Sequence, residues 1–309
     1  MRMAYRVALL LPLLATLRVM AAEPPLAAPP AAPPTAPAAA AQPTLVFMTD
    51  FGQRDDSVAL CKGVMLGIEP RLRIVDLSHD VEPYSVLDGA RFLMGTAPYY
   101  PAGTVFVTVI DPGVGSERRA IVAKTKRGQF FVMPDNGLIT LLERQDGIAE
   151  VRNITNTAWH LNPTISSTFH GRDVFSPVGA RIAHGDDWTQ VGPAITDWKR
   201  LDIPEVKLTD AGLNGTVLAI EYPYGNLKTN ADSSVLAKLG YQHGDTARVT
   251  FGKGHELRLP FVATFSDVPL GKPLMYVDSR GRVAFAVNQG SFAQANGIKP
   301  LMTFVLRRK

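Results

Sequence analysis

The chain has 309 residues, 46% of them hydrophobic, which is enough for one large or two modest domains with a buried core. Its formal net charge is +4, but residues 1–22 hold three arginines and no acid, so the rest of the chain has 29 basic against 28 acidic residues. A nearly neutral body excludes the strongly basic surface typical of proteins that bind nucleic acid or anionic membranes. We therefore expect no nucleic-acid partner.

The first 22 residues have the pattern of a secretory signal peptide. Arg2 and Arg6 precede an apolar run over residues 7–17, and small residues follow at 19–22. The apolar run is short for a membrane-spanning helix, so we expect cleavage and export to a bacterial periplasm, with an uncleaved membrane anchor as the alternative. Residues 23–43 are almost wholly Ala and Pro, which predicts an extended linker.

From Thr44 onward, buried-strand patterns alternate with helical apolar spacing. Strands are predicted over 44–49, 73–77, 104–110, 120–124 and 130–133, and helices over 56–68, 86–94 and around 138–144. This alternation predicts an α/β fold, with a three-layer α/β/α domain and a mostly parallel sheet over residues 44–205. Cys61, the only cysteine, allows no internal disulfide and lies on the apolar face of the first helix, where we expect it in the core.

The pattern changes after about residue 206. Short β-like runs separated by Gly-rich turns occupy 217–222, 247–251, 257–259, 274–277, 283–287 and 302–306. They predict a smaller β-barrel-like domain over residues 206–309.

Two acids, Asp50 and Asp111, follow predicted strands, at the edge where α/β sheets bind ligands. The sequence has no HExxH, no CxxC and no pair of histidines at metal-ligand spacing, so we expect no metal site. It also has no GxSxG or P-loop motif, and Gly113-Val-Gly115 lacks the third glycine of a dinucleotide-binding turn.

Six polar, Gly-rich segments stand between the predicted elements. Singly, each is compatible with ordinary turn or cap chemistry. They are Thr49–Gly52, Asp111–Arg118, Pro134–Gly137, Thr168–Asp173, Tyr224–Asn226 and Asp278–Gly281. In this order they resemble the S-adenosyl-L-methionine (SAM) hydroxide adenosyltransferases, the hydrolytic relatives of the SAM-dependent fluorinase and chlorinase, and the likeness runs from Thr44 to the C-terminus.

The resemblance implies hydrolysis of SAM to adenosine and L-methionine by water attacking C5′. In the hydrolytic branch an Asp, an Arg and a His activate this water, and they match Asp111, Arg118 and His170; the halogenases lack the three. Methionine leaves as a neutral thioether, which needs neither a proton nor a Lewis acid, so no cofactor is expected. The attacking water must lose a proton, and either His170 or Asp111 can accept it.

The resemblance also assigns contacts to the substrate. Asp50, with Phe51 beside it, matches the ribose-binding acid; Tyr224 and Asn226 match adenine contacts; Glu221 matches an Asp near the methionine ammonium; and Ser279 and Arg280 match the pair that holds the methionine carboxylate. Asn136 and Asn288 are further contacts by position. Arg172 and Asp173 are interpreted as a structural ion pair.

In the family the site lies between two subunits of a homotrimer, which implies the same assembly here, with SAM as the only small-molecule partner. Two other activities are weighed against hydrolysis. One is a SAM-dependent halogenase, and the other is an exported protein that binds SAM or adenosine with little turnover. A structural module tethered by the Ala/Pro linker is a third reading.

Overall fold

The computed structural model describes residues Gln42–Lys309, so the predicted signal peptide (1–22) and all but the last two residues of the predicted linker (23–43) lie outside the described part. Within Gln42–Lys309, no helix is long and apolar enough to cross a membrane. Two sheets are present, and the strands of the first end at Ile195 while those of the second begin at Lys207.

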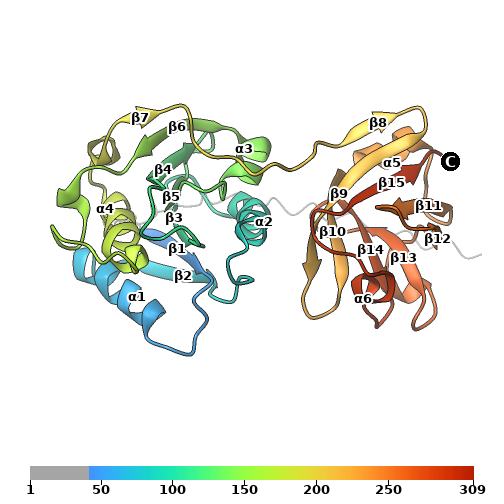
Figure 1. Ribbon diagram of the computed structural model, residues 1–309, viewed down its shortest axis with the longest axis horizontal. Helices are drawn as coiled ribbons and strands as arrows, with labels where there is room; N and C mark the ends of the chain where they lie inside the picture. The colour runs from blue at the N-terminus through green and yellow to red at the C-terminus, as the bar shows by residue number, and fades with distance from the viewer. Residues whose placement is uncertain (1–41) are drawn as a thin grey trace, which may run out of the picture. The chain divides into compact units, whose positions relative to one another are not determined.

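The first sheet has the strand order β2-β1-β3-β5-β4-β6-β7 (Figure 1). Its strands are β1 (Thr44–Thr49), β2 (Arg73–Ser78), β3 (Val105–Val109), β4 (Ala120–Thr125), β5 (Phe130–Pro134), β6 (Ile148–Asn153) and β7 (Ala194–Ile195). The pairs β1–β2, β1–β3 and β3–β5 are parallel, and only β4 and β7 run against the rest. The expected mostly parallel sheet is therefore confirmed.

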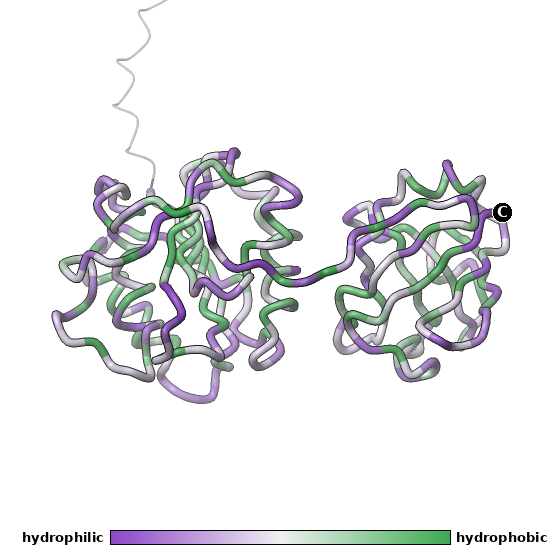
Figure 2. The backbone as a smooth tube through the Cα atoms, turned by 45° about the horizontal axis from the view of Figure 1, so that its top comes forward, coloured by the Kyte–Doolittle hydropathy of each residue, from purple (hydrophilic) through white to green (hydrophobic). Residues whose placement is uncertain are grey.

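Helices cover both faces of this sheet. The helices α1 (Ser57–Ile68) and α4 (Ser176–His184) share one core with Leu45 and Phe47, whereas α2 (Val86–Thr96) and α3 (Thr140–Asp146) lie on the side of Val46 and Met48. Successive strand residues point to opposite faces, so β1 is apolar at every position between its ends. The strands of this sheet are accordingly mostly green in Figure 2.

The second sheet is antiparallel, with the order β12-β11-β15-β9-β10-β14-β13 and β8 paired to β9. Its strands are β8 (Lys207–Thr209), β9 (Gly212–Glu221), β10 (Asn226–Asp232), β11 (Thr246–Phe251), β12 (Glu256–Pro260), β13 (Pro273–Val277), β14 (Arg282–Val287) and β15 (Thr303–Arg307). A bridge between Phe261 and Met275 brings the two edges together, which makes the sheet a nearly closed barrel, as expected. Phe251, Phe285 and Phe304 pack inside it.

Every strand and helix predicted from periodicity is present within a few residues, and Cys61 is fully buried, where burial raises the pKa of its thiol to about 11. The elements that were not predicted are short or polar. They are β6, β7, β8, β10, α4, α5 (Ser234–Leu239) and α6 (Phe292–Asn296). The strand β10 reads Asn-Leu-Lys-Thr-Asn-Ala-Asp, and α4 contains Pro177 and Gly179, so local propensity argues against both.

Gly179 provides a test of how α4 packs on the sheet. A methyl group there would lie 2.2 Å from Val107 Cγ2, whereas one at Gly63 in α1 would meet nothing within 4 Å. We expect Gly179→Ala to destabilise the protein by about 1–3 kcal/mol through overpacking. The matched Gly63→Ala should stabilise it by up to about 1 kcal/mol through helix propensity. Urea unfolding of both variants measures the difference, and equal stabilities would contradict the close contact.

Candidate active site

The predicted catalytic residues meet at the carboxyl edge of the first sheet. Asp111 comes two residues after β3, and Arg118 ends the loop that Asp111 begins. Arg118 Nε donates to Asp111 Oδ1 at 2.8 Å and its Nη2 donates to Asp111 Oδ2. The same Nη2 lies 2.8 Å from His170 Nδ1, in a loop 52 residues further along the chain. One guanidinium group therefore contacts both other members of the predicted triad.

A glycine brings the two loops together. Gly115, in the middle of the Asp111–Arg118 loop, has a φ of +76°, and a Cβ there would lie 2.4 Å from the backbone oxygen of Ser167. Any other residue would push this loop away from the segment that carries His170. His170 is followed by a π-helical turn, Gly171–Phe175, and the Arg118 guanidinium lies 5.2 Å from the centre of the buried Phe175 ring.

His170 is held in its neutral form. Burial lowers the pKa of its imidazole below the usual value, and the Arg118 charge lowers it further, while Asp111 and Asp173 act in the opposite direction. A guanidinium has no acceptor, so His170 Nδ1 must be the acceptor in the contact with Arg118. The hydrogen-bond network thus assigns the ring proton to Nε2.

Asp50 shares a cavity with Asp111 and His170. This cavity has a volume of about 370 Å³ and is also lined by Phe51, Tyr84 and Phe169. Burial raises the pKa of Asp50 above its usual value, a hydrogen bond from Tyr84 N (2.9 Å) opposes the rise, and the Asp111 carboxylate adds to it. The predicted ribose-binding and catalytic residues therefore line one surface.

Tyr84 was missed by sequence reasoning. Its side chain is exposed and its φ is +65°, a conformation that non-glycine residues rarely adopt. Strain of this kind clusters at functional sites. Only the folded backbone shows it, because Tyr84 stands before the Ser85 cap of α2 in an otherwise ordinary turn.

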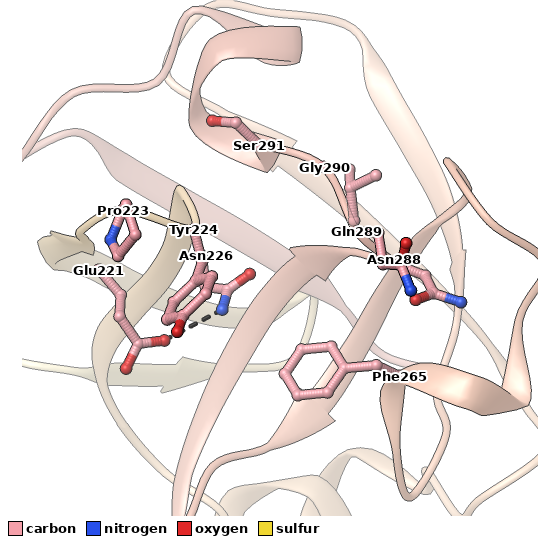
Figure 3. A pocket seen from close by; sticks show the side chains of 10 residues that line it. Glu221, Pro223, Tyr224, Asn226, Phe265, Asn288, Gln289, Gly290 and Ser291 are labelled. Atoms are coloured by element: carbon pink, nitrogen blue, oxygen red, sulfur yellow. Dashed lines mark hydrogen bonds between the residues drawn. The ribbon is translucent and has the colours of Figure 1, made fainter.

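A second cavity, of about 790 Å³, is formed by residues of the barrel domain and is lined by four further predicted contacts (Figure 3). Glu221, Tyr224, Asn226 and Asn288 line it, and Asn226 Nδ2 donates to Glu221 Oε2 at 3.0 Å. Gly225 makes this turn possible, since its φ is +74° and a Cβ would lie 2.0 Å from Ser291 Oγ. Phe265, which was not predicted, adds an aromatic ring to the lining.

Lys228 was also missed. Its Nζ lies 3.4 Å from Glu221 Oε1 and 3.5 Å from Asp278 Oδ2, between two carboxylates. Asp278 Oδ1 in turn accepts hydrogen bonds from the backbone nitrogens of Arg280 and Arg282. Lys228 therefore ties the Glu221 side of the cavity to the turn that carries Ser279 and Arg280.

Three predicted contacts do not line either cavity. Ser279 and Arg280 are exposed in the turn between β13 and β14, and their side chains are not gathered with Glu221 and Asn226. Asn136 is used structurally, because its Nδ2 donates to Ile110 O at 2.8 Å and its Oδ1 accepts from Leu138 N at 3.3 Å. It ties the loop after β5 to the end of β3.

The predicted ion pair of Arg172 and Asp173 is confirmed, with 2.6 Å between Arg172 Nε and Asp173 Oδ1. Burial alone would raise the pKa of Asp173, but the Arg172 side chain and the Ser166 N–H outweigh it and lower the pKa. Among residues 42–309, no three His, Cys, Asp or Glu side chains lie close enough together to hold a metal ion.

The Arg118–His170 contact predicts a measurable change in titration. Replacing Arg118 by Met removes a positive charge beside the ring, so the pKa of His170 should rise toward its usual value. An NMR titration of the histidine Cε1–H resonances measures it. Arg91→Met, which removes an arginine paired with Asp88 on α2, is the control and should leave His170 unchanged. An unchanged His170 pKa in Arg118→Met would show that the guanidinium does not act on the ring.

Comparison with known proteins identifies the family of the chain. Residues 45–192 match the model of the SAM hydroxide adenosyltransferase N-terminal domain, and residues 215–304 match that of its C-terminal domain. The chain is 40% identical over 265 residues to the (R)-S-adenosyl-L-methionine hydrolase of Salinispora tropica, covering 84% of this chain and 95% of that protein.

Two further proteins extend the comparison. The chain is 32% identical over 292 residues to the fluorinase of Actinoplanes sp. (strain N902-109), covering 86% of this chain and 98% of the relative. The crystal structure of an uncharacterized conserved protein from Thermotoga maritima aligns with a TM-score of 0.80 at 34% identity, covering 85% of this chain and 99% of that one. With both domain models matched and the relatives covered almost end to end, the chain belongs to the SAM hydroxide adenosyltransferase family.

Proposed function

We propose that this protein hydrolyses SAM to adenosine and L-methionine, with water as the nucleophile at C5′. The observation that carries the proposal is the Asp111–Arg118–His170 cluster, built around one guanidinium group beside the cavity that holds Asp50. The relatives include both a hydrolase and a fluorinase, so likeness alone does not choose between water and halide. The cluster supports water as the nucleophile, because it supplies a proton acceptor, which a halide does not need.

The two cavities suit different parts of the substrate. Both volumes lie within the range of about 300–1,000 Å³ that small-molecule sites occupy. Asp50 would accept both ribose hydroxyls, Asn226 would bind the adenine edge, and Tyr224 and Phe265 offer rings for stacking. Glu221 would face the methionine ammonium, with Ser279 and Arg280 reaching the carboxylate from the neighbouring turn.

The hydrogen-bond network supports a separate role for each of His170, Arg118 and Asp111 in activating the water. His170 holds its proton on Nε2 and can donate it to one lone pair of the attacking water. Its Nδ1 is occupied by Arg118, so it has no free nitrogen for the proton of the water. Asp111 retains lone pairs beyond those that Arg118 uses, and we assign it the role of proton acceptor.

The reaction then balances as a simple displacement. The water oxygen forms a bond to C5′ as the C5′–S bond breaks, and the electron pair of that bond stays on sulfur, giving neutral methionine thioether. One water proton passes to Asp111 and then to solvent. Positive charge leaves the sulfonium during attack, so a pocket poor in water favours the reaction, and in-line placement of the water and C5′ contributes further.

We further propose a homotrimer in which each site combines cavities from two subunits. The cavity with Asp50 and His170 has no lining residue from the barrel, and the cavity with Glu221 and Asn226 has none from the first sheet. SAM is long enough to need contacts from both sets at once. We also propose that the reaction needs no metal and that the protein is exported to the periplasm. These two proposals rest on the sequence alone, on its lack of metal-ligand motifs and on the signal-peptide pattern of residues 1–22.

The first test is an HPLC assay of the purified chain with SAM. We expect adenosine and L-methionine from the wild type, and a loss of at least about a hundredfold in His170→Ala and Arg118→Ala. Adenosine retained without turnover would instead indicate a SAM- or adenosine-binding protein, and a 5′-halogenated adenosine in halide buffer would indicate a halogenase. The name of the Salinispora tropica relative specifies the (R) sulfonium, so both epimers should be followed.

A second test addresses the shared site. His170→Ala damages the cavity of the first domain, and Asn226→Ala damages the cavity of the barrel. Because the proposed site needs both cavities, each variant alone should be inactive. If subunits share sites, co-refolding an equal mixture should restore about a quarter of the wild-type activity, because one interface in four combines two intact halves. Mixing His170→Ala with Arg118→Ala, which damage the same half, is the control and should restore nothing. No recovery in the first mixture would place both halves in one subunit.

A further inference from the structure

A chain of buried polar groups runs behind Asp50, in an otherwise apolar part of the fold. Thr49, the last residue of β1, is fully buried, and His79, just after β2, is 2% exposed. Thr49 Oγ1 lies 2.9 Å from His79 Nδ1, and the His79 ring packs edge-on against Phe47 at 4.9 Å. Burying a hydroxyl and an imidazole costs free energy unless their polar atoms are paired. The burial of these two polar side chains in an apolar region therefore calls for an explanation.

The donors and acceptors in this chain follow a single direction. His79 Nε2 lies 3.1 Å from Asp76 Oδ1 without forming a regular hydrogen bond, and the Asp76 carboxylate can only accept. The imidazole proton therefore belongs on Nε2, which leaves Nδ1 to accept the Thr49 hydroxyl proton. The Thr49 oxygen is then free to accept, and it receives the Phe51 N–H at 3.2 Å.

The far end of the chain is anchored by a cation. Burial alone would raise the pKa of Asp76, but the Lys62 ammonium, 2.6 Å from Asp76 Oδ2, together with His79 lowers it below its usual value. Asp76 therefore remains an acceptor for His79 at neutral pH. Lys62 lies on α1 and Asp76 on β2, so the anchor is formed by two elements that pack on β1.

The near end reaches the turn that carries Asp50. His79 makes two contacts with this turn. Its ring pairs with the Thr49 hydroxyl, and its backbone carbonyl oxygen accepts from Gly52 N at 2.7 Å. Asp50 and Phe51, both lining the cavity with His170, lie between these two attachment points. The turn is therefore held at residues 49, 51 and 52 by Thr49 and His79, neither of which lines the cavity.

We propose that Thr49 and His79 are positioning residues that hold the Asp50 carboxylate in the orientation needed to accept both ribose hydroxyls. Neither side chain touches the substrate, because both are buried behind the turn. The Thr49 hydroxyl acts through the Phe51 amide. His79 acts through its ring on Thr49 and through its backbone carbonyl on the Gly52 amide. The inference rests on the proposed function for its ligand, but the restraint on the turn exists without any ligand.

The adjacent strand offers a matched control. Thr108 on β3 is also fully buried, and it pairs with Met48, the residue before Thr49. Its hydroxyl has no hydrogen-bond partner among residues 42–309. Thr49→Val and Thr108→Val make the same chemical change at neighbouring buried sites. Only the first removes the acceptor for Phe51 N–H and the donor to His79.

Two measurements on the full chain test the proposal. The first is calorimetric affinity for adenosine and 2′-deoxyadenosine. The wild type should prefer adenosine by about tenfold or more, as expected for a hydrogen bond to a carboxylate. We expect Thr49→Val to lose most of this preference, and to raise KM for SAM more than it lowers kcat, while Thr108→Val keeps wild-type values. His79→Asn, which retains an acceptor for the Thr49 hydroxyl, should preserve more of the preference than His79→Leu.

The second measurement is hydrogen exchange at the Phe51 and Gly52 amides without ligand. Thr49→Val should speed exchange there, and Thr108→Val should not. If Thr49→Val keeps both the ribose preference and the slow exchange, the positioning role is wrong. If the wild type binds no adenosine and turns over no SAM, the proposed function fails, while slow exchange lost only in Thr49→Val still supports the restraint on the turn.

Discussion

Burial of the central strands on both faces is the constraint on which the rest of this structure depends. Helices cover both sides of β1 and β3, so side chains along these strands must be apolar, and polar groups can reach solvent only where the strands end. The Asp111–Arg118 loop after β3 and the turn after β1 both leave the sheet at this edge. Asp50 and Asp111 meet there because parallel strands end on the same side.

The chemistry at that edge is organised by Arg118. A single nitrogen, Nη2, donates to Asp111 and to His170, which come from loops far apart in the chain. Burial lowers the pKa of the His170 imidazole, and the Arg118 charge lowers it further. In the proposed reaction, the neutral ring would donate to the attacking water without placing a full charge next to the sulfonium. Arg118 also orients the carboxylate that would take the proton. One side chain thereby contacts both partners, and its charge contributes to the lowered pKa of His170.

Polar groups beneath the surface support this arrangement at several points. Asn136 joins the loops after β3 and β5, the Arg172–Asp173 pair braces the turn after His170, and the Thr49–His79 pair lies beneath the turn of Asp50. In the barrel, Lys228 has a similar place between Glu221 and Asp278. Apart from Glu221, which lines the barrel cavity, the residues of these contacts are not among the lining residues of either cavity.

Periodicity in the sequence determined the two-part architecture, because long apolar strands and amphipathic helices carry their own pattern. The order of the polar segments also identified Asp50, Asp111, Arg118 and His170. Local pattern did not reveal α4 or β10, whose composition opposes their conformation, nor Tyr84, Phe265 and Lys228, whose roles depend on neighbours from other strands. Only the tertiary structure showed that the Asn136 side chain bonds to the backbone of Ile110 and Leu138. It also showed that the two cavities share no lining residue. Such contacts join residues tens of positions apart, and no local periodicity records which loops will meet.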